Sequence, residues 1–122
     1  MAGEIKRATR VAEGLRQEIA VLLGRKVRDP RLLSVVVSRV VLTDDLRSAK
    51  VYVRLLVDDS ERRDAALKGL ARAGGMLRRE ATRALKLRVA PELRFFFDEG
   101  EDARERIERV LDEIKREDQN RD

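Results

Sequence analysis

The sequence predicts an α+β domain with one three-stranded sheet and helices on one face of it. Apolar residues recur at helical spacing in three separate stretches, and β-branched residues alternate in two short runs joined by a polar turn. The chain has 122 residues, of which 43% are hydrophobic, so it can bury one modest core. The expected order is helix, strand, strand, helix, kink, helix and strand, followed by a C-terminal helix.

The first helix is expected from Lys6 to Leu23, because Gly24 stands where a helix would stop. Its apolar positions recur at helical spacing: Val11, Leu15, Ile19, Leu22 and Leu23. The runs "SVVVSRVVLT" and "AKVYVRLLV" then predict an antiparallel hairpin. Alternation in the second run places one set of side chains toward the core, namely Val51, Val53, Leu55 and Val57, and another set on the opposite face, namely Lys50, Tyr52 and Arg54.

A long helical stretch follows, with Asp59 or Ser60 as its expected N-cap. One side of it is assigned to the core: Leu67, Leu70, Ala71, Gly74, Leu77, Ala81 and Leu85. The opposite side is basic and contains Lys68, Arg72, Arg79, Arg83 and Lys86, with Gly75 in the same stripe.

Gly74 and Gly75 lie in the middle of this stretch, and the pair penalises a straight helix by about 2 kcal/mol. They predict a kink that exposes backbone N–H groups to an anionic oxygen. In the alternative interpretation the glycines only end one helix and begin the next, and the arginines are simply solvated.

The C-terminal third is expected to supply the last strand and the last helix. "APELRFFFDEG" predicts a short strand entered through Pro91. Ala103, Ile107, Val110, Leu111 and Ile114 then form the apolar face of a helix. The whole chain, residues 1–122, is expected to be a single domain, with a compact core over about 6–114 and a frayed tail over 115–122.

Charge is distributed unevenly along the chain. The net charge is +5, and 22 of the 28 basic residues are arginine, whose planar guanidinium binds phosphate with two hydrogen bonds. Residues 1–31 and 61–88 are basic, whereas residues 98–122 hold six basic and eleven acidic residues. This asymmetry favours a polyanionic partner for the body of the domain.

The residue types that are missing restrict the chemistry. The chain has no cysteine and no histidine, so the commonest nucleophile, general base and metal ligands are absent. We therefore expect no catalytic residue, no metal and no cofactor. The sequence has no apolar run near the roughly 20 residues that a membrane span needs, so we expect a cytoplasmic protein that does not bind membranes.

Several stretches, in this order and spacing, resemble the ribosome-binding factor A family of bacterial ribosome assembly proteins. They are "RVAEGLRQEIAVLL", "VRDPRL", "VVVSRVVLTDDLRSAKVYV", "ARAGGMLRREATRALKLRVAPELRFFFDEG" and "RIERVLDEI", and they cover about Lys6 to Ile114. The resemblance implies a KH-like domain of the type II order, in which an Ala-x-Gly kink replaces the usual Gly-x-x-Gly loop. Ala73, Gly74 and Gly75 match that kink, with glycine also at the variable position.

The resemblance also implies a function. It implies a non-enzymatic monomer that binds the free 30S subunit and its 16S rRNA during late maturation, and that assists 5′-end processing and growth in the cold. We expect RNA contacts around the kink from Arg72, Arg78, Arg79, Arg83, Lys86 and Arg88. A second contact zone is expected from Lys6, Arg7, Arg10, Arg25, Lys26, Arg28 and Arg31. At least two of the phenylalanines at positions 95–97 are expected in the core, so RNA shape and phosphates, and not bases, would be recognised.

Two other functions stay open at this point. The protein could be an adaptor whose acidic C-terminal helix recruits another protein. It could also be a hydrolase that uses Asp44 with Asp45, or Asp58 with Asp59. Both aspartate pairs stand at expected turns or helix starts, where aspartate is common for backbone reasons.

Overall fold

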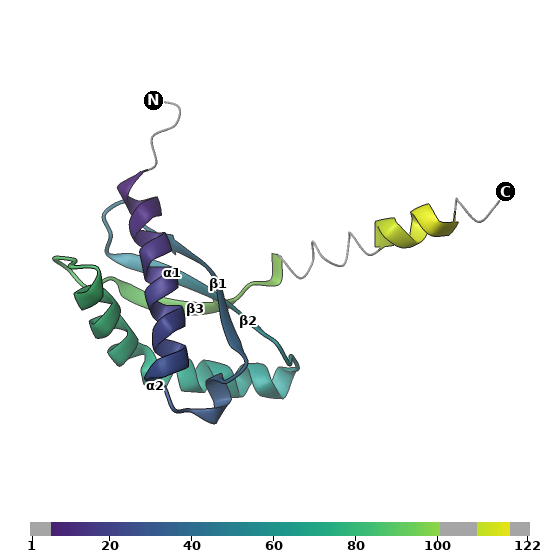
Figure 1. Cartoon of the computed structure of the whole chain (residues 1–122), viewed down its shortest axis with the longest axis horizontal. Coiled ribbons are helices and arrows are strands. Elements are labelled where there is room, and N and C mark those ends of the chain that lie inside the picture. The colour runs from purple at the N-terminus through teal and green to yellow at the C-terminus, as the bar shows by residue number, and fades with distance from the viewer. Residues whose placement is uncertain (1–5, 101–109, 118–122) are drawn as a thin grey trace.

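The computed structural model describes residues 6–100 and 110–117 of the chain (Figure 1). The elements are α1 (Arg7–Arg25), the short 3-10 helix η1 (Pro30–Leu32), β1 (Val35–Leu42), β2 (Ser48–Leu55), α2 (Ser60–Ala84) and β3 (Glu92–Phe97). The predicted α+β fold is confirmed. The first helix ends two residues later than expected, because Gly24 is accommodated inside α1.

The sheet has the strand order β1-β2-β3. β1 and β2 pair antiparallel, as the hairpin pattern predicts, and β3 pairs parallel to β2. The register of the first pair shifts between Val37 and Arg39, which leaves Ser38 as an extra residue in β1. Arg39, Tyr52 and Phe96 are consequently direct neighbours across the three strands.

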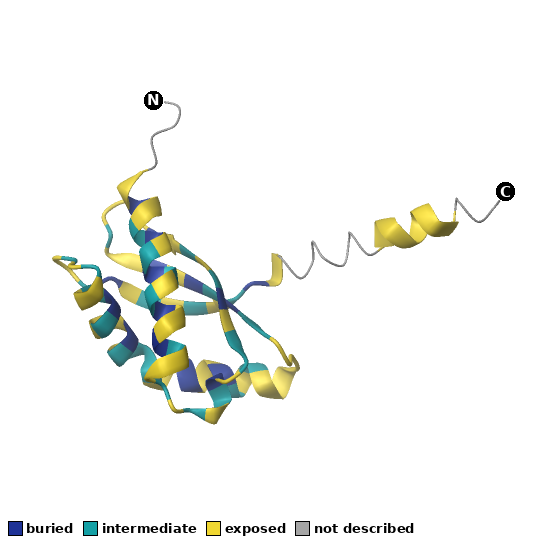
Figure 2. Cartoon of the chain, in the orientation of Figure 1, coloured by how far each residue is buried: buried dark blue, intermediate teal, exposed yellow. Residues whose placement is uncertain are grey.

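The helices α1 and α2 pack on one face of this sheet, and the core lies between these two helices and the strands (Figure 2). Val51 and Val53 of β2 are fully buried there, as the alternation predicts, together with Ala49, whereas Leu55 is only partly buried. Val57 is exposed instead, because β2 ends at Leu55 and the chain has left the sheet two residues later.

The long helix α2 begins at an aspartate cap and runs unbroken for 25 residues. The Asp59 carboxylate accepts a hydrogen bond of 2.7 Å from the backbone N–H of Arg62, so Asp59 is the N-cap. Figure 1 shows α2 changing direction near its middle, between its teal and green parts. The helix bends without interruption, and the expectation of free N–H groups at a second helix start is therefore wrong.

The buried side of α2 differs in part from the side that the periodicity predicts. Leu70, Leu77 and Ala81 are buried as expected, but Leu67 is 39% exposed and Ala71 is also exposed. Ala66 and Gly69 are buried in their place. The reason is that η1 packs against this side of α2. Leu32 of η1 lies so close that a Cβ atom added at Gly69 would be only 3.0 Å from Leu32 Cδ2. The first half of α2 thus presents its small residues to η1.

The C-terminal part of the chain contributes no described residue to the core after Asp98. Residues 110–114 are helical, as predicted, and the helix continues through residue 117 into the part that was expected to fray. Figure 1 shows this segment standing away from the domain. Val110, Leu111 and Ile114 are each about half exposed, so these three residues of the predicted apolar face do not lie in the described core. Ala103 and Ile107 fall outside the described residues. No helix in the described part is long and apolar enough to cross a membrane.

Candidate nucleic-acid interface

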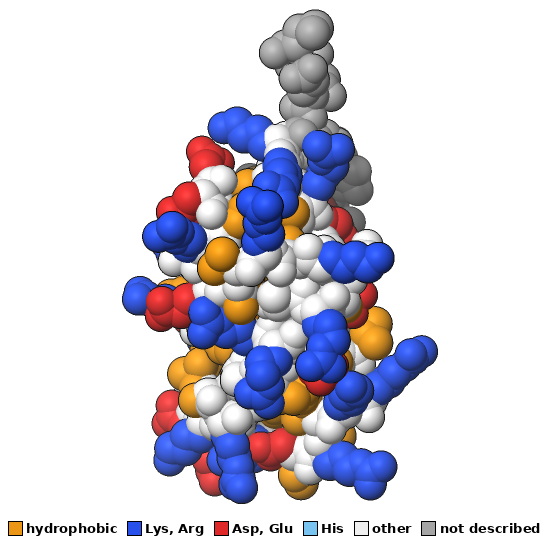
Figure 3. All heavy atoms as spheres, turned by 90° about the vertical axis from the view of Figure 1, so that its left-hand side faces the viewer, with side chains coloured by type: hydrophobic (Ala, Val, Ile, Leu, Met, Phe, Trp, Pro, Cys, Tyr) orange, Lys and Arg blue, Asp and Glu red, His pale blue; other side chains and the backbone are white. Residues whose placement is uncertain are grey.

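The basic stripe of α2 lies on the surface, as the sequence predicts. Its cations and those of the following loop are all exposed or partly exposed: Arg72, Arg78, Arg79, Arg83, Lys86 and Arg88. Figure 3 views the molecule from this side, and Lys and Arg side chains gather over the face while Asp and Glu are fewer. The structure therefore presents a face whose charge suits a polyanion.

One hollow joins this stripe to the loop that follows α1. It has a volume of about 440 Å³, and Arg28, Asp29, Arg31, Gly69 and Arg72 contribute to its wall. The Asp29 carboxylate accepts hydrogen bonds of 3.0 and 2.7 Å from Nε and Nη2 of Arg31. These bonds hold the pKa of Asp29 below its usual value and neutralise Arg31. Arg28 and Arg72 line the same hollow, and the charge of Arg72 also contributes to lowering the pKa of Asp29.

A second hollow of about 420 Å³ lies between α2 and β3 beside the two glycines. Leu67, Gly74, Gly75, Arg78 and Phe95 are part of its lining. A Cβ added at Gly74 would lie 3.8 Å from Phe95 Cε2, which is an ordinary contact distance, so the fold itself does not require glycine there. The glycines instead leave helix backbone open to the hollow.

Besides Arg31, three more of the predicted cations have partners among the described residues. Lys26 Nζ lies 3.2 Å from Glu80 Oε2, and Arg83 Nη1 lies 3.9 Å from Glu80 Oε1. Arg78 donates a hydrogen bond of 2.8 Å to the backbone oxygen of Ala90. The Lys26 and Arg83 pairs are exposed, so they contribute little stability and can exchange for phosphate.

The predicted N-terminal zone is divided by the fold. Arg7 lines a hollow together with Arg88, so it adjoins the loop after α2. Arg10 lines a different hollow between α1 and β1, and is not brought to the stripe. Lys6 and Arg25 are also exposed, and α1 carries no acidic residue in its first turn. Cations at a helix N-terminus oppose the helix dipole, and a bound anion would relieve that repulsion.

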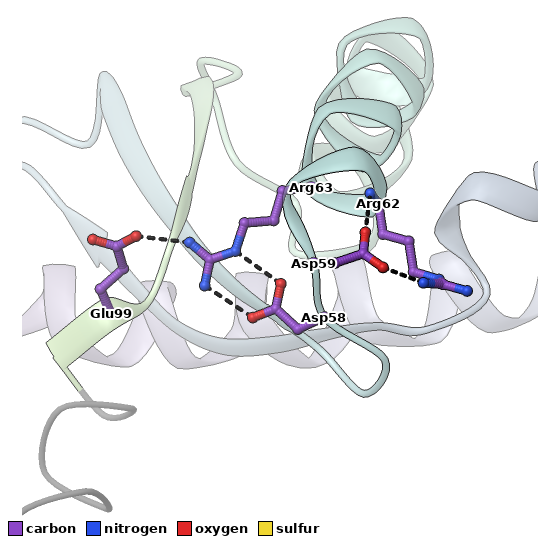
Figure 4. A network of polar contacts seen from close by, with 5 residues as sticks. All are labelled: Asp58, Asp59, Arg62, Arg63 and Glu99. Carbon is purple, nitrogen blue, oxygen red and sulfur yellow. Dashed lines mark hydrogen bonds and ion pairs between the residues drawn. The ribbon is translucent and has the colours of Figure 1, made fainter.

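The pair Asp58 and Asp59 has a structural role (Figure 4). The Asp58 carboxylate accepts hydrogen bonds of 2.8 and 2.9 Å from Arg63, whose Nη1 also lies 2.7 Å from Glu99 Oε1. Asp59 caps α2 and also pairs with the Arg62 side chain. The contact with Arg63 lowers the pKa of Asp58, which makes that carboxyl a poor general acid.

The hairpin pair is equally unsuited to chemistry. Asp45 accepts hydrogen bonds from Thr43 Oγ1 and from the N–H of Arg47, as a turn residue does, and Asp44 beside it is exposed. Among the residues that the structure describes, no three His, Cys, Asp or Glu side chains could hold a metal ion. The hydrolase alternative therefore has no candidate site in the described chain.

Comparison with known proteins decides the family. The family model described as ribosome-binding factor A matches residues 7–111. This chain belongs to the ribosome-binding factor A family. A member from Sorangium cellulosum is 57% identical over 117 residues, which are 94% of each chain. A member from Chromohalobacter salexigens is 45% identical over 111 residues, which cover 90% of this chain and 85% of the other.

Solved structures of the family share the fold. The crystal structure of ribosome-binding factor A from Thermus thermophilus is 27% identical, with a TM-score of 0.64 over 73% of this chain and 93% of that one. A homology model of the Thermus thermophilus protein, fitted into a cryo-EM map of a complex with 30S, is also 27% identical. It gives a TM-score of 0.60 over 72% of this chain and 91% of the other.

Sequence reasoning missed two groups outside the stripe. Arg39 lies over the ring of Tyr52 on the face of the sheet that the helices leave open. Phe96 is beside it and 41% exposed, whereas Phe95 and Phe97 pack against the core. Alternation along β3 predicts that Phe96 faces away from its two neighbours, but it does not show which face is covered.

Proposed function

We propose that this protein binds the 30S subunit and its 16S rRNA during late maturation, through the exposed cations of α2 and the adjoining loops. The observation that carries the proposal is the hollow that Arg28 and Arg72 both line beside Ala73, on a face dominated by basic side chains. Family membership and the 30S complex of the Thermus thermophilus relative support the choice of partner.

Recognition in this proposal depends on phosphates and RNA shape. The exposed arginines contact phosphate oxygens with their planar guanidinium groups, and the bare backbone at Gly74 and Gly75 lets RNA approach the helix closely. The protein performs no chemistry of its own and acts as a cytoplasmic monomer. By holding immature RNA in one shape, it assists 5′-end processing and growth in the cold.

The test is co-sedimentation with purified small subunits across a salt series. Wild type is compared with an Arg72/Arg79/Arg83→Ala variant and with a matched variant, Arg47/Lys115/Arg116→Ala, which removes the same charge from positions elsewhere. Removing one cation that neutralises a phosphate makes the slope of log affinity against log salt shallower by about 0.7 to 0.9. The stripe variant should therefore bind more weakly, with a slope shallower by about 2 to 3. The matched variant should follow wild type.

Three results would count against the proposal. Binding that resists salt and survives the stripe variant would favour the adaptor alternative. Equal weakening in the two triple variants would show that only net charge matters, and equal binding to large subunits would remove the specificity.

For processing, cells without this protein should accumulate 5′-extended small-subunit RNA at low temperature, and only wild type should restore the mature end.

A further inference from the structure

The face of the sheet opposite the helices carries a row of flat side chains. Arg39 of β1, Tyr52 of β2 and Phe96 of β3 are direct cross-strand neighbours. The ring centroids of Tyr52 and Phe96 lie 5.8 Å apart with the rings tilted by 34°, and the Arg39 guanidinium lies 3.9 Å from the Tyr52 centroid. This row crosses the sheet, and no described helix packs over it.

The Arg39 guanidinium is held in place by a buried carboxylate. Asp98 is 4% exposed, and its Oδ2 lies 3.2 Å from Arg39 Nε. The Ser38 hydroxyl donates a hydrogen bond of 2.7 Å to the same oxygen. With Asp98 at its edge and Tyr52 beneath it, the guanidinium loses little further conformational freedom on binding. The Arg39 side chain is nevertheless 54% exposed, so a ligand can reach it.

The surroundings of the row suit a polyanion that also presents flat apolar groups. Lys50, Arg54 and Arg94 stand on the same face of the strands, where Glu92 is the one strand carboxylate among the described residues and lies 3.4 Å from Arg94. Phe96 is 41% exposed and Val41 is 47% exposed. Cations beside stacked aromatic or guanidinium planes are the arrangement by which proteins bind unpaired bases of single-stranded RNA.

We propose that the row of Arg39, Tyr52 and Phe96 is a stacking platform for unpaired bases of single-stranded RNA. The platform rests on the proposed RNA binding and extends it, because the platform contacts bases on a different face of the domain from the phosphate contacts of α2. One base stacks on the outer side of the Arg39 guanidinium and a neighbouring base on Phe96. Asp98 acts as a positioning residue for Arg39.

The acidic C-terminal segment is a less suitable occupant of this face. Residues 110–117 stand away from the domain in Figure 1. Residues 98–122 as a whole hold six basic and eleven acidic residues, so the cations of the sheet would attract this segment as they would RNA, and charge alone does not separate the two occupants. The segment's apolar residues are aliphatic and gain nothing special from flat partners. RNA supplies both the negative charge and the planar groups.

The experiment compares two fluorescently end-labelled ligands of equal length on the full chain. One is a single-stranded RNA oligonucleotide, and the other is an abasic oligomer with the same number of phosphates. Stacking of even one base makes wild type bind the oligonucleotide at least about fivefold more tightly than the abasic oligomer, by fluorescence anisotropy. Arg39→Lys keeps the charge and removes the plane, and Phe96→Leu keeps an apolar side chain and removes the ring. Both should bring the affinity ratio toward one.

Two further variants serve as controls. Phe96→Tyr keeps the aromatic face and should keep the ratio, and Lys50→Gln removes a charge without a plane and should weaken both ligands equally. Circular dichroism verifies that each variant is folded, and the conservative replacements keep the test usable. A wild-type ratio near one, or a ratio unchanged in both Arg39→Lys and Phe96→Leu, would overturn the platform.

The proposed function and the platform fail in different ways. Salt-sensitive small-subunit binding that depends on the α2 stripe, together with an affinity ratio near one, would refute the platform alone. The affinity ratio could instead rise when Val110, Leu111 and Ile114 are replaced by serine and stay unchanged in Phe96→Leu. That result would assign the face to the C-terminal segment. Absence of binding to both oligomers and to small subunits would refute both proposals.

Discussion

Replacing the two glycines of α2 by alanine tests why the bend is built from glycine. Neither glycine has a positive φ, and a Cβ would lie 3.8 Å from Phe95 Cε2 at Gly74 and 3.5 Å from Arg79 Nη1 at Gly75. Both positions therefore have room for a methyl group. Since glycine in a helix interior costs about 1 kcal/mol relative to alanine, the Gly74→Ala/Gly75→Ala variant should be more stable by about 2 kcal/mol.

Thermal unfolding followed by circular dichroism measures this gain. A chain of this length gains roughly 4 °C in Tm per kcal/mol, so the double variant should melt about 8 °C higher. Gly69→Ala is the matched comparison, because its Cβ would lie 3.0 Å from Leu32 Cδ2 and 3.1 Å from Asp29 Oδ2, so crowding should offset the propensity gain and Tm should rise less per glycine than in the double variant. A double variant less stable than wild type would refute the reasoning, because it would show that the folded helix itself requires glycine at the bend.

Three other outcomes follow from the described contacts. Leu77 is fully buried, so Leu77→Ala should cost about 2 to 5 kcal/mol in urea unfolding, and a cost below about 1 kcal/mol would mean that the second half of α2 is loosely packed. Asp59→Ala removes the N-cap hydrogen bond and should lower Tm, whereas Asp59→Asn should retain most of it. The Arg63 contact lowers the pKa of Asp58, so its stabilisation is complete above the unfolded pKa of about 3.8 and disappears as the pH falls through the folded value. An Arg63→Gln variant should therefore lose less stability than wild type as the pH falls from about 5 to about 2, and an identical acid profile would contradict this assignment.

Periodicity predicted the helices and strands of this fold better than it predicted which of their faces other elements cover. Residues such as Leu15, Ile19, Val51 and Val53 are buried as the spacing predicts, because one helix face or strand face has one environment along its length. Leu67 is exposed against expectation, since η1 takes the neighbouring side of α2, and a tertiary contact of that kind leaves no periodic signal.

In the candidate site, too, spacing along one helix could be read from the sequence, whereas contacts between elements could not. The exposed stripe of α2 follows from helical spacing alone, so it could be read from the sequence. The hollow that Arg28 and Arg72 both line could not, because it depends on how the loop after α1 folds against α2. The cross-strand row was hidden for a similar reason. It requires the register shift at Ser38 and the parallel pairing of β3, neither of which a strand pattern specifies.

The glycines connect stability with function in this domain. A helix that keeps glycine at two sites with room for alanine forgoes stability that its own packing does not oblige it to lose. If the glycines confer a benefit, it lies in something that approaches the helix from outside or in the bend itself. Measuring small-subunit binding by the double alanine variant separates these possibilities from the one in which the glycines have no role in binding. If the double variant is more stable than wild type and binds small subunits more weakly, the glycines contribute to the RNA contact. If it is more stable and binds as well as wild type, the basic side chains make up the whole of that interface.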